Sequence, residues 1–176
     1  GLTFSFQSFS KADDISDFQI EGMSIGDNLL DYFTKEQIKK KGIFYYPKSK
    51  RIGGVRINKN NYKLYESTQF TFYPTSYEIT SVAGLIEFDN NIDKCLKKKI
   101  EIQNSLLEIF SSVIPKEKKI IHPYDKSGNS IIYKTAFNFK DGSSIQIECF
   151  DWAKGVYSQN SELRDTLSVS LNSIEY

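Results

Sequence analysis

One short stretch of the chain holds residue types that could carry acid–base chemistry. His122 is the only histidine, and Asp125 follows it within the loop His122-Pro123-Tyr124-Asp125. An imidazole beside a carboxylate can act as a general base. The same stretch also has the composition of an ordinary turn, because Asp, Ser and Gly favour turns. His122 and Asp125 are therefore weak acid–base candidates, and no residue is assigned as catalytic.

Cys95 and Cys149 are the only two cysteines. Cys95 falls on the apolar stripe of an expected helix, and Cys149 falls on the apolar face of an expected strand. A helix lying on the sheet would bring the two together, which favours a disulfide in an exported chain. Two buried thiols that never pair are the alternative.

Several kinds of site are missing from the sequence. A single histidine, with both cysteines on core faces, excludes a Cys/His metal centre. The chain contains no glycine-rich phosphate loop, no dinucleotide-binding fingerprint and no G-x-S-x-G nucleophile elbow. We therefore expect no cofactor and no metal.

The charges are segregated along the chain although the net charge is only +1. Six acids and no bases lie from Asp13 to Asp31, whereas ten bases and one acid lie from Lys35 to Lys63. Aromatic residues are interleaved with the basic stretch, and together they predict a surface for an anionic partner. The candidates are Lys48, Lys50, Arg51, Arg56, Lys59, Tyr45, Tyr46 and Tyr62.

Two other interpretations of this segregation stay open. In one, the tyrosines pack a curved sheet and the lysines are simply solvated. In the other, the acidic segment lies over the basic segment and neutralises it. The balanced total charge gives no reason to expect nucleic acid as a partner.

The elements that must position these residues are strands and helices in mixed order. Capping signals predict two short helices or one bent helix over 24–41. Helical spacing predicts one long helix over 91–114, with an apolar stripe formed by Ile92, Cys95, Leu96, Ile100, Gln103, Leu106, Leu107, Phe110 and Val113. Alternation and aromatic content predict strands at 43–46, 55–57, 62–65, 70–73, 77–88, 131–139, 145–149 and 167–171. Gly84, inside the longest strand, predicts a bulge or a close approach by another part of the chain.

A chain of 176 residues has the length of one ordinary domain. We expect an α+β fold in which an antiparallel meander of five to seven strands is packed by one long helix and a short N-terminal helical segment. This domain would span residues 13–176. Residues 1–12 are apolar and free of acids, with small residues at Ser10 and Ala12, and are interpreted as the remainder of a signal peptide. A native edge strand is the alternative. No apolar run is long enough to form a transmembrane helix.

The residues from Asp17 to Phe33 resemble the start of a group of uncharacterised small exported proteins from AT-rich marine bacteria. The segment Glu148-Cys149-Phe150-Asp151-Trp152 fits that group as well. More distantly, the order strand, Gly22-Met23-Ser24, helix is similar to the opening of small outer-membrane-assembly lipoproteins. No lipobox cysteine lies near Ala12, so the resemblance implies no lipid anchor.

These observations favour an exported protein, periplasmic or secreted, that acts as a non-enzymatic binding or interaction module in envelope assembly or maintenance. The expected partner is an envelope protein or an anionic surface. A carboxylate- or histidine-dependent hydrolase-like enzyme is the alternative function.

Overall fold

The computed structural model describes residues 15, 18–46, 49–58, 61–157 and 163–174, without the side chains of 46, 49, 50 and 157. Residues 1–12, interpreted above as the remainder of a signal peptide, lie outside this set. Within it the chain forms one eight-stranded antiparallel sheet, three α-helices and one short 3-10 helix. The expected α+β class is confirmed, with eight strands rather than five to seven.

The two halves of the chain contribute similar sets of elements. The first half supplies η1 (Leu29–Asp31), α1 (Lys35–Lys41), β1 (Phe44–Tyr46), β2 (Ser49–Asn58), β3 (Ser67–Phe72) and β4 (Ile79–Glu87). The second half supplies α2 (Ile92–Ile109), β5 (Lys116–Ile121), β6 (Ile131–Asn138), β7 (Ser144–Asp151), α3 (Lys154–Tyr157) and β8 (Thr166–Asn172).

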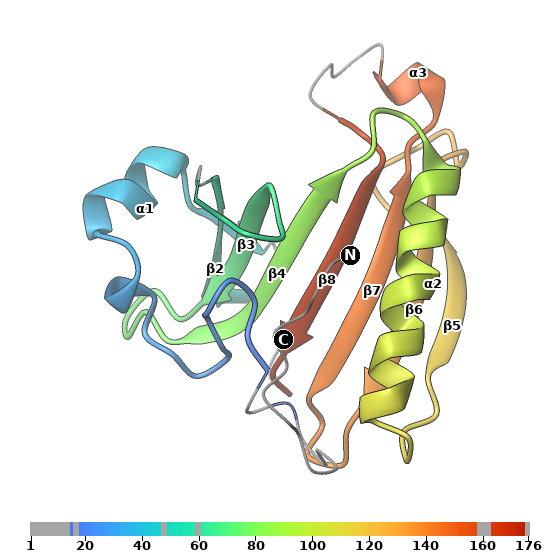
Figure 1. Ribbon diagram of the computed structural model, residues 1–176. Helices are drawn as coiled ribbons and strands as arrows, with labels where there is room; N and C mark the ends of the chain where they lie inside the picture. The colour runs from blue at the N-terminus through green and yellow to red at the C-terminus, as the bar shows by residue number, and fades with distance from the viewer. Residues whose placement is uncertain (1–14, 16–17, 47–48, 59–60, 158–162, 175–176) are drawn as a thin grey trace.

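The strand order across the sheet is β1-β2-β3-β4-β8-β7-β6-β5. Each half is thus a four-stranded meander, and the two meanders join where the last strand of one pairs with the last strand of the other. Gly84 of β4 lies opposite Val169 of β8 at this junction. The helix α2 carries the chain from β4, near the middle, to β5 at the far edge (Figure 1).

The two faces of the sheet differ in chemistry. Residues directly opposite each other on antiparallel strands point to the same face, so the register sorts the side chains. One face, here called the helix face, carries Val55, Phe70, Val82, Leu171, Ile147 and Thr135. The other, here called the hollow face, carries Arg56, Gln69, Ala83, Ser170, Gln146 and Ala136.

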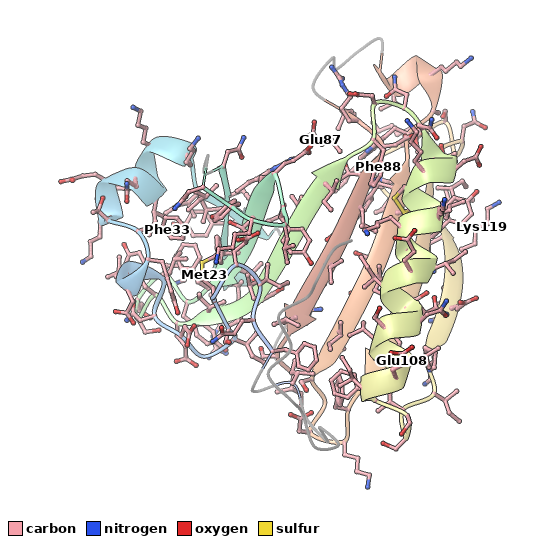
Figure 2. The ribbon with its side chains drawn as sticks, viewed as in Figure 1. Met23, Phe33, Glu87, Phe88, Glu108 and Lys119 are labelled. Carbon is pink, nitrogen blue, oxygen red and sulfur yellow. A yellow bond between two sulfur atoms is a disulfide. The ribbon has the colours of Figure 1, made fainter. Side chains whose placement is uncertain are left out.

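Two separate segments cover the helix face. The helix α2 lies over the second meander, while the N-terminal segment with η1 and α1 packs on the first (Figure 1). Phe33 meets Phe70 of β3 edge to face, with ring centroids 5.6 Å apart. Met23 and Phe33 are both buried between this segment and the sheet (Figure 2). Each such buried side chain contributes on the order of 2 kcal/mol to folding.

The expected long helix differs from the observed one in its end and in its packed side. The long helix ends at Ile109, not Ile114, because Phe110 leaves helical geometry at φ −105° and ψ 54° and is itself fully buried. Its packed side also differs, since the buried residues are Cys95, Lys99, Ile102 and Leu106. Ile100, expected on the packed stripe, is 56% exposed.

The expected strand over 62–65 is a loop instead. The amide groups of Lys63, Leu64 and Tyr65 donate to the Glu21 carboxylate at 2.9, 2.7 and 3.1 Å rather than to a neighbouring strand. This loop presses the Tyr65 ring onto Gly84, where a Cβ atom would lie 2.4 Å from the ring. The expected close approach at Gly84 is therefore confirmed.

Candidate functional site

The predicted disulfide is present and joins Cys95 to Cys149, with their Cα atoms 6.0 Å apart. Both residues are fully buried, one on α2 and the other on the helix face of β7. The bond joins the long helix to the sheet at the point where the buried side of α2 meets the apolar side of β7. A stable disulfide is compatible with an oxidising compartment.

His122 sits in an aromatic box. Its imidazole lies 4.2 Å from the Trp152 ring and 5.9 Å from the Phe150 ring, measured between centroids. Nδ1 accepts a hydrogen bond from the Tyr124 amide at 3.3 Å. Burial lowers the pKa of His122 below its ordinary value, which favours the neutral form of the ring. This geometry holds a loop against the sheet.

Asp125 closes the following turn. Its carboxylate accepts hydrogen bonds from the amides of Ser127 and Ser130, each at 2.8 Å, and from the Ser130 hydroxyl at 2.7 Å. Hydrogen bonds from Ser127 and Ser130 hold the pKa of Asp125 well below its usual range. No hydrogen bond joins the Asp125 and His122 side chains within the described residues, so the pair is not arranged as a catalytic dyad.

The predicted basic and aromatic surface is divided in the structure. Arg56 lies on the hollow face, where it contacts Glu87 of β4 at 3.0 Å. Tyr62 is half-buried on the other side, because its hydroxyl bonds Thr68 of the helix face at 2.7 Å. Tyr45 is 54% exposed near the sheet edge.

The remaining residues of the predicted basic and aromatic surface are exposed or lie outside the described residues. Arg51 is exposed on β2. Lys48 and Lys59, with the side chains of Tyr46 and Lys50, lie outside the described residues. Acidic Glu21 bonds backbone amides instead of lysine side chains, so this carboxylate does not neutralise the basic segment through an ion pair.

The hollow face holds a recess that the sequence did not predict. The recess has a volume of about 140 Å³. Strands β3 and β7 both line it although β4 and β8 lie between them, so the sheet curls toward this face. It is lined by Gln69, Phe70, Thr71, Ser81, Ala83, Leu85, Gln146, Glu148, Phe150, Ser168 and Ser170.

Small side chains form the centre of this recess and longer ones form its wall. Ser168 and Ser170 of β8 lie beside Ala83 of β4, and all three are buried. Lys134 of β6 lies beside this wall, with its Nζ atom 2.6 Å from the Gln146 amide oxygen and 3.0 Å from the Glu148 carboxylate. The wall is therefore polar but electrically balanced.

Unused hydrogen-bonding groups point to binding at the recess. The hydroxyl of Ser168 is part of a side chain only 6% exposed, yet it forms no hydrogen bond with another described residue. The Gln69 amide, half-buried on β3, also has no partner among the described residues. Neither group is sealed from solvent, because Ser173 Oγ is the one buried side-chain polar atom without a partner in the described part of the chain. Both groups are therefore accessible to a polar ligand in the recess.

Sequence reasoning missed this recess for a physical reason. Its residues come from strands about 100 positions apart, and they meet only because β8 inserts beside β4. The available signal was the alternation of serines at 168 and 170 with apolar residues, which is also the pattern of a strand with one solvated face.

In the described part of the chain, no three His, Cys, Asp or Glu side chains gather in a way that could hold a metal ion. No helix of that part is long and apolar enough to cross a membrane. Comparison of the chain with protein-family models, with curated proteins and with solved structures found no match.

Proposed function

We propose that the protein is an exported, non-enzymatic binding module that serves envelope assembly or maintenance and holds its partner through the recess of the hollow face. The unpaired Ser168 hydroxyl in this recess is the observation that carries the proposal. A polar group that enters meets Ser168 on β8 and Gln69 on β3, which both have unused hydrogen-bonding capacity. Such bonds are stronger in a partly enclosed site than in water.

The size of the recess favours a macromolecular partner. About 140 Å³ is smaller than the roughly 300–1,000 Å³ typical of small-molecule sites. The space suits one polar side chain, or a sugar-sized group, that projects from a larger component. Since Lys134 and Glu148 balance each other, we expect this group to be uncharged, such as an amide or a hydroxyl.

Export is supported by the disulfide and by the apolar, acid-free start of the sequence. Structural disulfides persist in oxidising compartments and are rare in the cytosol. The hydrolase alternative depends on His122 and Asp125, which both bond backbone groups here, and no observation favours it. The anionic-partner surface stays a separate prediction.

A photo-cross-linking experiment tests the binding site. Benzoylphenylalanine replaces Phe150 in the full chain, expressed in its own cells, and we expect one dominant envelope product after irradiation. Ser168→Leu fills the recess and should abolish this product, whereas Ser112→Leu, at an exposed turn, should preserve it. A product that survives Ser168→Leu would refute the assignment.

A milder variant guards against misfolding. Gln69→Ala removes one of the two unused groups without adding bulk, and should weaken the cross-link in a protein with an unchanged circular dichroism spectrum.

Export is tested separately by mass spectrometry of the periplasmic fraction without reduction. Recovery only from the cytosol, with two free thiols, would overturn the proposed compartment.

A further inference from the structure

The helix α2 reverses the usual pattern of burial at two adjacent positions. Lys99 is only 7% exposed, whereas Ile100 is 56% exposed. Lysine is among the residue types least often buried. Positions that break a local rule of folding without compensation are frequently functional.

The Lys99 ammonium group is incompletely paired. It has three N–H groups to donate; one bonds the Thr135 hydroxyl and another bonds the Gln103 amide oxygen at 3.4 Å. No ion pair within the described residues includes Lys99. The Glu117 carboxylate, which attracts it, is bonded by the Gln103 amide nitrogen at 2.8 Å. One N–H is left without a partner among the described residues. Glu117 attracts the buried charge but forms no direct ion pair with it, and a buried charge that is incompletely paired is costly.

An open groove adjoins this ammonium group. The groove lies between α2 and the edge strand β5 and has a volume of about 400 Å³, within the range of small-molecule sites. We call it the Lys99 groove. Leu96, Ile100 and Tyr133 give it apolar surface, and Lys119 holds its Nζ atom 5.2 Å from the centre of the Tyr133 ring. Lys119 is at the outer edge of the sheet (Figure 2).

The charges around the groove select an anion. Lys99 and Lys119 contribute two positive charges against one negative charge from Glu117. Lys118 also borders the groove, but the register places its side chain on the hollow face, opposite Lys134. Lys134 also borders the groove, but its charge is balanced by Glu148 at 3.0 Å. The remaining excess is positive, and the single acid disfavours a multiply charged ligand such as phosphate.

We propose that the Lys99 groove binds an aliphatic monocarboxylate, such as a medium-chain fatty acid. The carboxylate accepts a hydrogen bond from the remaining N–H of Lys99 and is attracted by the positive charge of Lys119. The alkyl chain covers Leu96 and Ile100, which removes their apolar surface from water. This ligand supplies both the missing counter-charge and the missing apolar cover.

Calorimetric titration of the full chain with decanoate, below its micelle concentration, tests this proposal. We expect decanoate to bind, and we expect decanol, which lacks the charge, and butyrate, which lacks most of the chain, to bind at least tenfold more weakly. Lys99→Met should reduce decanoate affinity at least tenfold, while Lys97→Met, at an exposed position of the same helix, should leave it unchanged. No binding to the unmodified chain, or equal binding to Lys99→Met, would overturn the proposal.

A second variant keeps the test decisive if Lys99→Met fails to fold. Ile100→Asp changes an exposed side chain, so the fold should persist, and it should lower decanoate affinity at least tenfold. Unchanged affinity would refute the groove. Because the recess lies on the opposite face of the sheet, Ser168→Leu should not alter decanoate binding, and the two proposals can fail independently.

Discussion

Removal of the Cys95–Cys149 disulfide should lower the stability of the protein by a predictable amount. The bond joins residues 54 positions apart. In the chain-entropy model, closing a loop of this length in the unfolded state stabilises the folded state by about 4 kcal/mol. For a chain of this size, that loss corresponds to a fall in melting temperature of roughly 8–16 °C. We therefore expect the double variant Cys95→Ala/Cys149→Ala to unfold well before the oxidised protein.

Urea unfolding, followed by circular dichroism, measures this difference directly. The unmodified protein is compared in oxidised and reduced form with the double variant in both conditions. Reduction should bring the unmodified protein to the level of the double variant and should leave the double variant unchanged. A difference in the free energy of unfolding below about 1 kcal/mol between the oxidised protein and the double variant would refute the reasoning. The disulfide would then not restrict the unfolded chain as the chain-entropy model requires.

Three further changes have defined outcomes. Gly84→Ala places a methyl group against the buried Tyr65 ring and should lower stability by about 2–3 kcal/mol in urea unfolding, so an unchanged midpoint would contradict the close contact. Glu21→Ala removes the acceptor of three amide groups of the 63–65 loop and should lower the free energy of unfolding by about 2 kcal/mol. Amide hydrogen exchange should become faster in that loop alone, and unchanged exchange rates would count against this role of Glu21. The Asp125 pKa is depressed in the folded state, so its stabilising effect is complete above the ordinary carboxyl pKa of about 4 and is lost as the pH falls below it. Asp125→Asn should weaken that acid-induced loss in melting curves from pH 2 to pH 7, and an identical pH profile would exclude the effect.

Local sequence patterns predicted most of the architecture. Alternation and β-branched content identified the strands that have one apolar face, such as the strand from Ile131. The strands from Ile131 and Ser144 are joined at Asp141-Gly142, a residue pair that favours hairpin turns, with Gly142 at φ 88°. These elements were predictable because their burial follows their own periodicity.

The edge strand β5 escaped prediction because it has no buried face. All six of its residues are exposed, and three of the first four are lysines. Lysines on an edge strand hinder pairing with other chains, so the same feature that protects this edge also removes the strand signal. The 62–65 segment was wrongly predicted as a strand. Its tyrosines favour strands, but its amide groups bond the Glu21 carboxylate, which is distant in the sequence.

The two proposed sites were harder to predict than the fold. The recess requires the pairing of β4 with β8, a long-range choice that local periodicity does not encode. The Lys99 groove depends on a small rotation of α2 about its axis, which buries Lys99 instead of Ile100. A helical stripe drawn from hydrophobicity alone assigns the lysine to solvent.

The place of β8 also governs when this protein can fold. The last strand among the described residues lies in the middle of the sheet, and its Asn172 bonds Ser81 from 91 positions earlier. The two meanders cannot join until residues 166–172 have been made, so a shorter nascent chain lacks the pairing of β4 with β8. Contacts of such high sequence separation slow folding. Because β8 pairs with a strand on each side, its deletion should be more damaging than deletion of either edge strand, β1 or β5.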